Sequence, residues 1–273
     1  MKPHINSTIL KKGILHKPRK RFGQNFLHDQ SVINRIIEAI NPCLNDRLVE
    51  IGPGQGALTE PLAATGAPLD CIELDRDLAK YLRQHYAENS QVTVYEKDGL
   101  KFDFAELAPA RGSLRIVGNL PYNTSTPMLF HLMKYQELIK DMTFMLQLEV
   151  VQRMTAKPGN KNYGRLGLML QYFCEIEHLF NVPSAAFSPK PKVVSALARL
   201  TPHSQFPIVA KDVNCLQIVI RTAFNQRRKT LKNSLKSIVS EETLNKLPLD
   251  GSLRPENLNL RDYVIISDAI SNQ

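Results

Sequence analysis

The sequence predicts an α/β fold, in which helices cover both faces of a mostly parallel β-sheet, followed by a smaller unit made of helices only. Three observations predict it. Short apolar runs alternate with helical stretches between residues 48 and 156, as is typical of β-α-β units in a parallel sheet. A cluster of glycines follows the first apolar run directly. After Pro202, the pattern changes to helical spacing alone.

The first half of the chain supplies the parallel strands. Asp29 or Ser31 can cap a first helix whose apolar residues, from 32 to 40, recur with helical spacing, and Pro42 ends it. Apolar runs bounded by turn residues then follow. We expect strands over residues 48–51, 69–74, 91–95 and 114–118, and helices over 57–64 and 77–86.

The second half adds further strands and then becomes helical. We expect helices over 126–135, 149–156 and 166–172, strands over 142–146, 176–182 and 193–200, and a polar loop over 157–162. A proline-rich loop over 183–191 contains one aromatic residue, Phe187, which we expect to be exposed. Further helices are expected over 211–224, 229–240 and 260–270. The predicted division is a flexible basic arm over 1–18, an α/β domain over 19–202 and a helical domain over 203–273.

Charge is the unusual feature of the composition. Hydrophobic residues make up 43% and charged residues 22% of the 273-residue chain, which is ordinary for a globular protein, but the net charge is +9. Residues 1–21 contain seven Lys or Arg and no acidic residue. A second basic cluster comprises Arg227, Arg228, Lys229, Lys232 and Lys236. A polyanionic partner is the natural inference, with a merely solvated basic surface as the alternative.

Cysteine usage and hydropathy indicate the compartment. The four cysteines are far apart, with neither a CxxC pair nor a histidine at metal-ligand spacing, so we expect no metal site and a reducing environment. No apolar run approaches the roughly 18–20 residues of a membrane span. The basic N-terminus lacks the apolar segment of a secretory signal. We therefore expect a cytoplasmic protein without a membrane partner.

Polar residues at three predicted strand ends indicate a nucleoside-containing cofactor. Gly52, Gly54 and Gly56 let the backbone approach a ligand closely, and the following helix presents free amides. Glu73, 21 residues beyond Gly52, is placed to bind both hydroxyls of a ribose. Asp98 follows the third strand and can reach an adenine edge. The carboxyl ends of parallel strands meet at one edge of the sheet, so these groups should converge.

The turn after the fourth strand, Asn119-Leu120-Pro121-Tyr122, indicates what that cofactor acts on. The Asn119 amide oxygen and the Leu120 carbonyl can accept the two hydrogens of a planar amine, while Tyr122 covers one face of its ring. S-adenosylmethionine, which combines an adenosine with a reactive methyl group, explains both halves. An ordinary turn with a packing tyrosine remains an alternative. So does a nicotinamide enzyme, because residues 52–57 also satisfy G-x-G-x-x-A.

Six motifs follow one another along the chain in an order that is typical of one enzyme family. They are Phe22-Gly-Gln-Asn-Phe-Leu27, Glu50-Ile-Gly-Pro-Gly-Gln-Gly56, Ile72-Glu-Leu-Asp75, Asn119-Leu-Pro-Tyr122, Phe187-Ser-Pro-Lys-Pro-Lys-Val193 and Ala223-Phe-Asn-Gln-Arg-Arg-Lys-Thr-Leu231. Together they resemble the small-subunit (16S) ribosomal RNA adenine dimethyltransferases, the family whose loss gives kasugamycin resistance. The resemblance spans residues 19 to 270. The related erythromycin-resistance methylases fit the C-terminal segment less well.

The resemblance implies a fold, a reaction and a partner. The fold is that of class I S-adenosylmethionine-dependent methyltransferases, with a Rossmann-like, seven-stranded, mostly parallel sheet and a small helical C-terminal domain for RNA recognition. The reaction dimethylates the exocyclic amines of two adjacent adenosines in the 3′-terminal hairpin loop of the small-subunit RNA. The partner is the precursor of the small ribosomal subunit, and we expect the protein to bind it as a monomer. An RNA-binding assembly checkpoint factor, in which catalysis is secondary, remains the alternative.

The resemblance also assigns residues. Cofactor binding falls to Gln24, Asn25, Leu27, Ile51, Gly52, Gly54, Glu73, Leu74, Asp98, Gly99 and Asn119. The target base is held by Asn119, Leu120, Pro121, Tyr122 and Phe187. The resemblance leaves the role of Glu50 undecided, because this side chain can hydrogen-bond to the glycine loop instead of a ligand. RNA contacts fall to Lys157, Lys161, Arg227, Arg228, Lys229, Lys232 and Lys236, and the recurrence of Arg228, Lys232 and Lys236 every four residues predicts a charged stripe on one helix.

Overall fold

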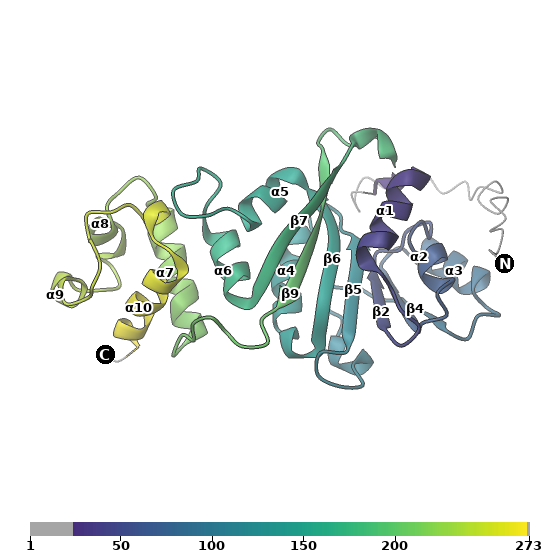
Figure 1. Ribbon diagram of the computed structural model, residues 1–273, viewed down its shortest axis with the longest axis horizontal. Coiled ribbons are helices and arrows are strands. Elements are labelled where there is room, and N and C mark those ends of the chain that lie inside the picture. Colours follow the sequence, from purple (N-terminus) through teal and green to yellow (C-terminus); the bar gives the residue numbers. More distant parts are fainter. Residues whose placement is uncertain (1–23, 272–273) are drawn as a thin grey trace.

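A computed structural model describes residues 24–271, so the predicted basic arm over 1–18 lies outside the described residues. One seven-stranded sheet forms the centre of the molecule, and the C-terminal helices lie beyond one of its ends (Figure 1). The strand order is β4-β3-β2-β5-β6-β9-β7. Within the described part of the chain, no helix has the length and apolarity needed to cross a membrane.

The predicted mostly parallel sheet is confirmed. Five strands run parallel: β2 (Arg47–Ile51), β3 (Leu69–Glu73), β4 (Val92–Glu96), β5 (Leu114–Asn119) and β6 (Ile139–Gln147). β9 (Ser195–Pro202) pairs antiparallel with both β6 and β7 (Cys174–Val182). Each strand expected from the sequence is present, with its ends shifted by a few residues. The carboxyl ends of β2, β3, β4 and β5 therefore share one edge of the sheet.

Helices cover both faces of this sheet, as predicted. They are α1 (Gln30–Ile40), α2 (Thr59–Ala63), α3 (Arg76–His85), α4 (Ser125–Met133), α5 (Leu148–Met154) and α6 (Arg165–Phe173). Successive side chains of a strand point to opposite faces. Thus Leu48 joins a core with residues of α1 and α2, whereas its neighbour Val49 joins a core with residues of α4, α5 and α6. Asp29 and Asp75 cap α1 and α3 through their carboxylates.

A two-stranded sheet lies apart from the main one. β1 (Phe26–Leu27) pairs antiparallel with β8 (Phe187–Ser188), and Leu27 stands opposite Phe187. The expectation that Phe187 is exposed is wrong: the residue is 3% exposed and packs in the core beneath α1. Pairing with a segment 160 residues away buries it, and the composition of its own loop carries no sign of that pairing.

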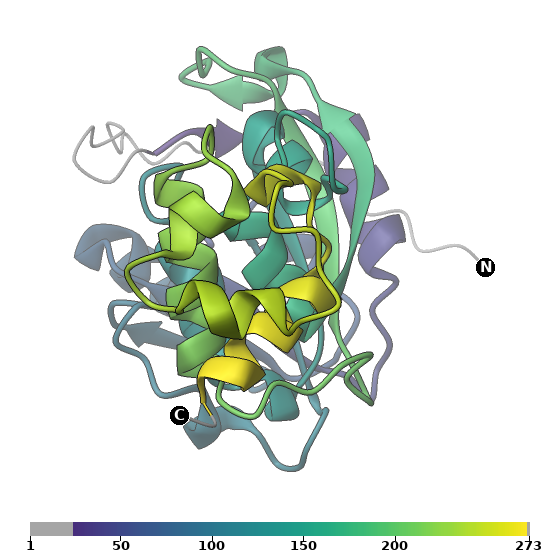
Figure 2. The same ribbon diagram turned by 90° about the vertical axis from the view of Figure 1, so that its left-hand side faces the viewer.

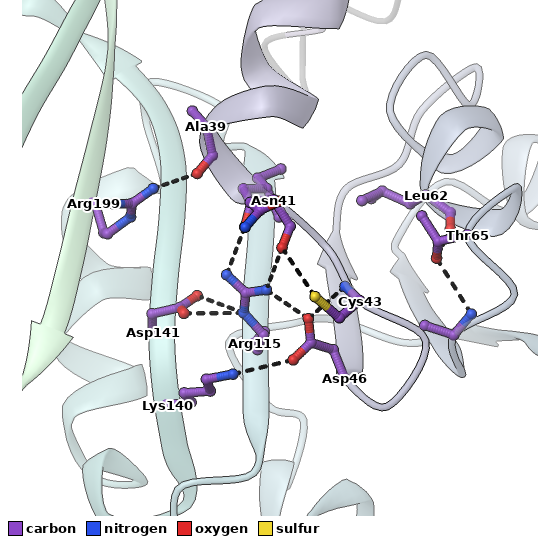
Figure 3. Close-up of polar contacts among 12 residues, drawn as sticks. Ala39, Asn41, Cys43, Asp46, Leu62, Thr65, Arg115, Lys140, Asp141 and Arg199 are labelled. Atoms are coloured by element: carbon purple, nitrogen blue, oxygen red, sulfur yellow. Dashed lines mark hydrogen bonds and ion pairs between the residues drawn. The ribbon is translucent and has the colours of Figure 1, made fainter.

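A buried cation fastens the end of α1 to the sheet (Figure 3). The Arg115 guanidinium, on β5, binds the carboxylates of Asp141 and Asp46 over 3.0 and 2.6 Å. It also donates to the carbonyl oxygens of Ile40 and Asn41, over 2.7 and 3.2 Å. Lys140 adds a second cation to Asp46. The cluster therefore ties the C-terminal end of α1 to β5 and β6.

The C-terminal unit packs on α6. Its helices are α7 (Val213–Asn225), α8 (Leu231–Leu235), α9 (Glu241–Asn245) and α10 (Leu260–Ile270), and Figure 2 looks onto them with the sheet behind. Their apolar residues share one core with Leu168, Met169 and Tyr172 of α6. The helix predicted over 229–240 is shorter in the structure, since α8 spans only Leu231–Leu235, and α9 was not predicted. Ser240 accepts from the Thr243 amide and thereby starts α9 as a separate helix.

Candidate active site

A cavity of about 360 Å³ lies at the carboxyl ends of the parallel strands. The stretch around β1, the glycine loop after β2, the end of β3 and the loops after β4 and β5 all contribute to its walls. The sequence-predicted cofactor residues all line it: Gln24, Asn25, Leu27, Ile51, Gly52, Gly54, Glu73, Leu74, Asp98, Gly99 and Asn119. Leu120, Pro121 and Tyr122 line it as well. The topology thus gathers residues that are up to 98 positions apart around one space.

The glycine loop forms one wall through its backbone. Gly52 and Gly54 have φ angles of +68° and +60°. Residues that carry a Cβ atom adopt such positive angles only with strain. A Cβ at Gly54 would lie 3.2 Å from the ring of Phe26. The loop therefore combines a turn that only glycine adopts without strain with a close approach of backbone to ring.

Glu73 is fixed at the end of β3 by two backbone amides. Gly54 donates to one carboxylate oxygen over 3.0 Å, and Asp75 donates to the other over 2.8 Å. Burial raises the pKa of the Glu73 carboxyl, and these two amides partly oppose that rise. Each carboxylate oxygen retains a second lone pair for a ligand hydroxyl. The two amides thus fix the orientation of the carboxyl group at the cavity wall.

Asp98 and Gly99 form the next section of wall. Asp98 accepts from the Leu100 amide over 3.0 Å, which orients its carboxylate. A Cβ at Gly99 would lie 2.8 Å from the Met128 methyl group and 3.4 Å from Ile51. The backbone at Gly99 therefore lies against two apolar side chains, next to a carboxylate. This set of groups suits a flat heterocycle that carries an amine.

The turn after β5 is held from several sides. The Asn119 side-chain amide donates to the Asn25 carbonyl over 3.0 Å, and the Leu120 amide donates to the Met145 carbonyl over 3.2 Å. A Cβ at residue 118 would lie 2.5 Å from the carbonyl oxygen of Ile51, so Gly118 permits β5 to pass that close to the end of β2. With its nitrogen engaged, Asn119 keeps its carbonyl oxygen, Oδ1, as an acceptor.

Tyr122 is anchored by its hydroxyl. That hydroxyl and the hydroxyl of Ser195, the first residue of β9, are 2.7 Å apart. Burial raises the pKa of Tyr122, so the phenol stays neutral. Phe187, expected on the other side of the target base, is not among the residues that line the cavity. The structure thus brings Asn119, Leu120, Pro121 and Tyr122 together at the cavity, whereas Phe187 lies in a hydrophobic core.

Comparison with known proteins identifies the family. Residues 15–270 match the family described as Ribosomal RNA adenine dimethylase. The chain belongs to the ribosomal RNA adenine dimethylase family. A member from Pseudomonas fluorescens, named Ribosomal RNA small subunit methyltransferase A, is 54% identical over 94% of this chain and 96% of its own length. Membership confirms the predicted methyltransferase class and S-adenosylmethionine as its cofactor.

Solved structures confirm the fold. A dimethyladenosine transferase from Plasmodium falciparum has a TM-score of 0.75 at 24% identity, covering 88% of this chain and 95% of its own. The 23S rRNA methyltransferase ErmE has a TM-score of 0.70 at 24% identity, covering 90% of this chain and 100% of its own. The family fold therefore extends over the C-terminal helices as well as the sheet.

Glu50 also lines the cavity. It is buried and accepts from the Thr59 hydroxyl over 2.6 Å, so it binds the start of α2. The glycine loop is instead bound by Glu73. Burial, with a smaller repulsion from Glu73, raises the pKa of Glu50 to about 7. Burial therefore favours the protonated form of Glu50 at a higher pH than for an exposed glutamate.

Sequence reasoning missed several supporting residues. Phe26 and Met128 line the cavity, and Ser195 anchors Tyr122. Phe26 stands in the first motif, so its position was a usable signal. Met128 and Ser195 reach the site through tertiary packing, for which the local sequence carries no signal.

The residues predicted to bind RNA divide into two groups. Arg227 pairs with Glu256, and Lys232 pairs with Glu241 over 3.2 Å. The others are exposed and form no ion pair with any residue between 24 and 271: Lys157, Lys161, Arg228, Lys229 and Lys236. The predicted stripe on one helix is wrong, because α8 spans only Leu231–Leu235 and so excludes Arg228 and Lys236.

Proposed function

We propose that the protein transfers methyl groups from S-adenosylmethionine to the exocyclic amines of two adjacent adenosines in the 3′-terminal hairpin loop of small-subunit (16S) ribosomal RNA. The observation that carries the proposal is the Asn119 amide, whose nitrogen is bound to the Asn25 carbonyl while the residue lines the cavity. Its oxygen is thereby presented as a fixed hydrogen-bond acceptor. Family membership supplies the class of reaction and of substrate.

The target amine needs activation, because its lone pair is delocalised into the adenine ring. When bound, S-adenosylmethionine supplies a methyl group on a positively charged sulfur. Asn119 Oδ1 and the Leu120 carbonyl accept the two amine hydrogens and favour a pyramidal nitrogen. Positive charge develops on that nitrogen during transfer, so both hydrogen bonds are stronger in the transition state than in the ground state. Fixed placement of the amine supplies the proximity contribution.

No strong general base is required. The methylated amine is acidic enough to lose its proton to water. Burial raises the pKa of Tyr122 and so keeps its phenol protonated, which leaves no phenolate to act as a base. Tyr122 instead stacks on the base, a contact worth roughly 1–3 kcal/mol, which offsets part of the few kcal/mol needed to extrude a base. Phe187 as the second stacking ring stays a prediction, and it requires the buried ring to turn out of the core in which it packs.

The partner is the precursor of the small ribosomal subunit, bound by a monomer in the cytoplasm. Its RNA backbone is contacted by Lys157, Lys161, Arg228, Lys229 and Lys236, the exposed basic residues outside ion pairs. The α/β domain over 19–202 carries catalysis, and the helical domain over 203–273 carries RNA recognition. Exposed Lys and Arg on both domains support this division of labour.

Methyl transfer to small subunits that lack the modification tests the proposal. Wild-type protein should incorporate radiolabelled methyl groups, and mass spectrometry of the 3′ hairpin should locate four of them on two adjacent adenosines. Asn119→Ala should bind the subunits but transfer at least 100-fold more slowly, the loss expected for one transition-state hydrogen bond (~10²–10³). If both proteins bind subunits and neither transfers, the assembly-factor alternative holds instead.

Family membership argues against the nicotinamide alternative, and calorimetry checks this directly. The proposed enzyme binds S-adenosylmethionine and is indifferent to NAD, whereas an oxidoreductase binds NAD. Glu73→Ala serves as the matched variant, since both cofactors place a ribose at this position and either one should then bind more weakly.

A further inference from the structure

We propose that Arg227 is a positioning residue rather than an RNA contact. On this proposal it joins the loop over 157–162 to the C-terminal helices, so that basic residues of both domains form one surface for a phosphodiester backbone. This inference rests on the proposed function, because it concerns how the same RNA substrate is held.

The donors of Arg227 are directed at the protein itself. Its Nε binds the carboxylate of Glu256. One terminal nitrogen donates to the Lys161 carbonyl over 2.9 Å, and the other reaches the Asn160 carbonyl at 3.4 Å. All three guanidinium nitrogens therefore contact acceptors, two of them on the backbone of the loop and one on the C-terminal domain.

Other contacts hold the same loop to the same segment. The Gly159 amide donates to the Glu256 carbonyl over 2.7 Å, and the Tyr163 hydroxyl donates to the Leu258 carbonyl over 2.8 Å. Figure 1 shows the loop between α5 and α6 extending toward the C-terminal helices. Arg227 thus belongs to a set of bonds that fixes where this loop lies.

Charge argues against a phosphate on Arg227. A phosphate placed against this guanidinium would also lie beside the negative charge of Glu256, which is at contact distance from Nε. Arg228 and Lys229 follow directly in the chain, and Lys161 supplies one of the carbonyls that Arg227 binds. These three side chains are exposed and form no ion pair with any described residue. Arg228 and Lys229 are the next two residues after Arg227, and the Lys161 backbone is bound to Arg227, so on this proposal one RNA segment contacts all three.

Two substitutions separate the roles. Arg227→Lys keeps the charge but loses the planar fork that binds three acceptors. Glu256→Gln removes a negative charge beside a polyanion-binding surface. We measure dissociation constants of the full-length variants for small subunits that lack the modification, across a series of salt concentrations at fixed Mg²⁺. Arg228→Ala is the matched phosphate-contact variant, and calorimetric affinity for S-adenosylmethionine checks that the cofactor site is intact.

The positioning role predicts that Arg227→Lys and Glu256→Gln each weaken RNA binding about ten-fold, the effect of one lost charge-assisted hydrogen bond, while cofactor affinity is unchanged. Arg228→Ala should lower the slope of log Kd against log salt by about 0.7–0.9. Tighter binding by Glu256→Gln, or wild-type binding by Arg227→Lys, would overturn the proposal. Failure of the wild-type protein to transfer methyl groups would overturn the proposed function instead, and the two binding comparisons would still be decisive here.

Discussion

The side-chain amide of Asn119 donates a hydrogen bond to the backbone carbonyl of Asn25 over 3.0 Å. This bond joins the turn after β5 to the segment before β1, 94 residues earlier in the chain. It also fixes which side of the amide faces other groups, since the nitrogen must face Asn25. The acceptor oxygen is thereby oriented before any substrate arrives, which is the condition for an electrostatic contribution to catalysis without reorganisation.

Replacing Asn119 with aspartate tests this orientation. Asn119→Asp keeps an acceptor but cannot donate to the Asn25 carbonyl, whose oxygen repels the carboxylate. We expect methyl transfer to fall at least ten-fold for Asn119→Asp and about 10²–10³-fold for Asn119→Ala, the range found on removing one preorganised hydrogen bond. Single-turnover transfer rates measure this, with exposed Asn34→Ala as the control. Wild-type activity of Asn119→Asp would contradict the role of the bond.

The Tyr122–Ser195 contact separates stacking from anchoring. Tyr122→Phe keeps the ring but removes the phenol hydroxyl, which lies 2.7 Å from the Ser195 hydroxyl. The buried Ser195 hydroxyl is then left without this partner. We expect a loss of about 1–3 kcal/mol in the free energy of unfolding with a small effect on the transfer rate. Tyr122→Ala also removes the stack, so transfer should fall about 5–150-fold, equivalent to roughly 1–3 kcal/mol.

Urea unfolding and single-turnover transfer together measure both effects. Ser195→Ala is the informative companion, because it removes the anchor without touching the ring. If Tyr122→Phe lowers the transfer rate as much as Tyr122→Ala, then the hydroxyl rather than the aromatic face is what the substrate needs.

The cofactor wall could be predicted from the sequence because its signals are local. Each signal can be recognised within a few residues: glycines after a strand, an acid at the end of the next strand, and a stiff turn after the fourth. Parallel topology then brings Gly52, Glu73 and Asn119 to one edge without further information.

Long-range pairing and helix ends were harder to predict. Phe187 stands in a proline-rich stretch that resembles a surface loop, and only its pairing with Leu27 buries it. The break after α8 had a local signal, Ser240 followed by Glu241 and Glu242, which is typical of a helix start. Sequence reasoning placed no helix between residues 240 and 260 and so missed this signal. A periodic recurrence of charged residues is a weak indicator of a helix, since exposed charges do not have to pack against a core.

The Arg115 cluster should be central to stability. Its guanidinium is 8% exposed and serves two carboxylates and two carbonyls, so Arg115→Ala leaves buried acceptors without a partner. We expect a loss of about 3–5 kcal/mol in the free energy of unfolding, the range for breaking a buried ion pair. Arg153→Ala, which breaks an exposed pair with Glu149, should cost less than about 1 kcal/mol. Urea unfolding compares the two, and equal losses would contradict the assigned role.

Glu50 should make stability depend on pH in a direction opposite to that of most carboxyl groups. Its pKa of about 7 in the folded protein exceeds the unfolded value of 4.5. Between these two values the folded state binds a proton that the unfolded state has released. The free energy of unfolding therefore falls as the pH rises through this window, and it levels off above pH 7.

The glutamine variant isolates this contribution. Glu50→Gln cannot ionise and can still accept from Thr59, so it should remove the Glu50 contribution to the decline, about 3 kcal/mol for a shift of this size. Glu73, whose pKa burial also raises, contributes to the decline in both proteins. Urea unfolding of both proteins at pH 5 and pH 8 measures the difference, with exposed Glu88→Gln as the control that leaves the decline in place. An equal change between the two pH values in wild type and Glu50→Gln would mean that Glu50 is ionised in the folded protein throughout. Its burial beside Glu73 would then need a counter-charge, and among residues 24–271 no cation contacts either carboxylate.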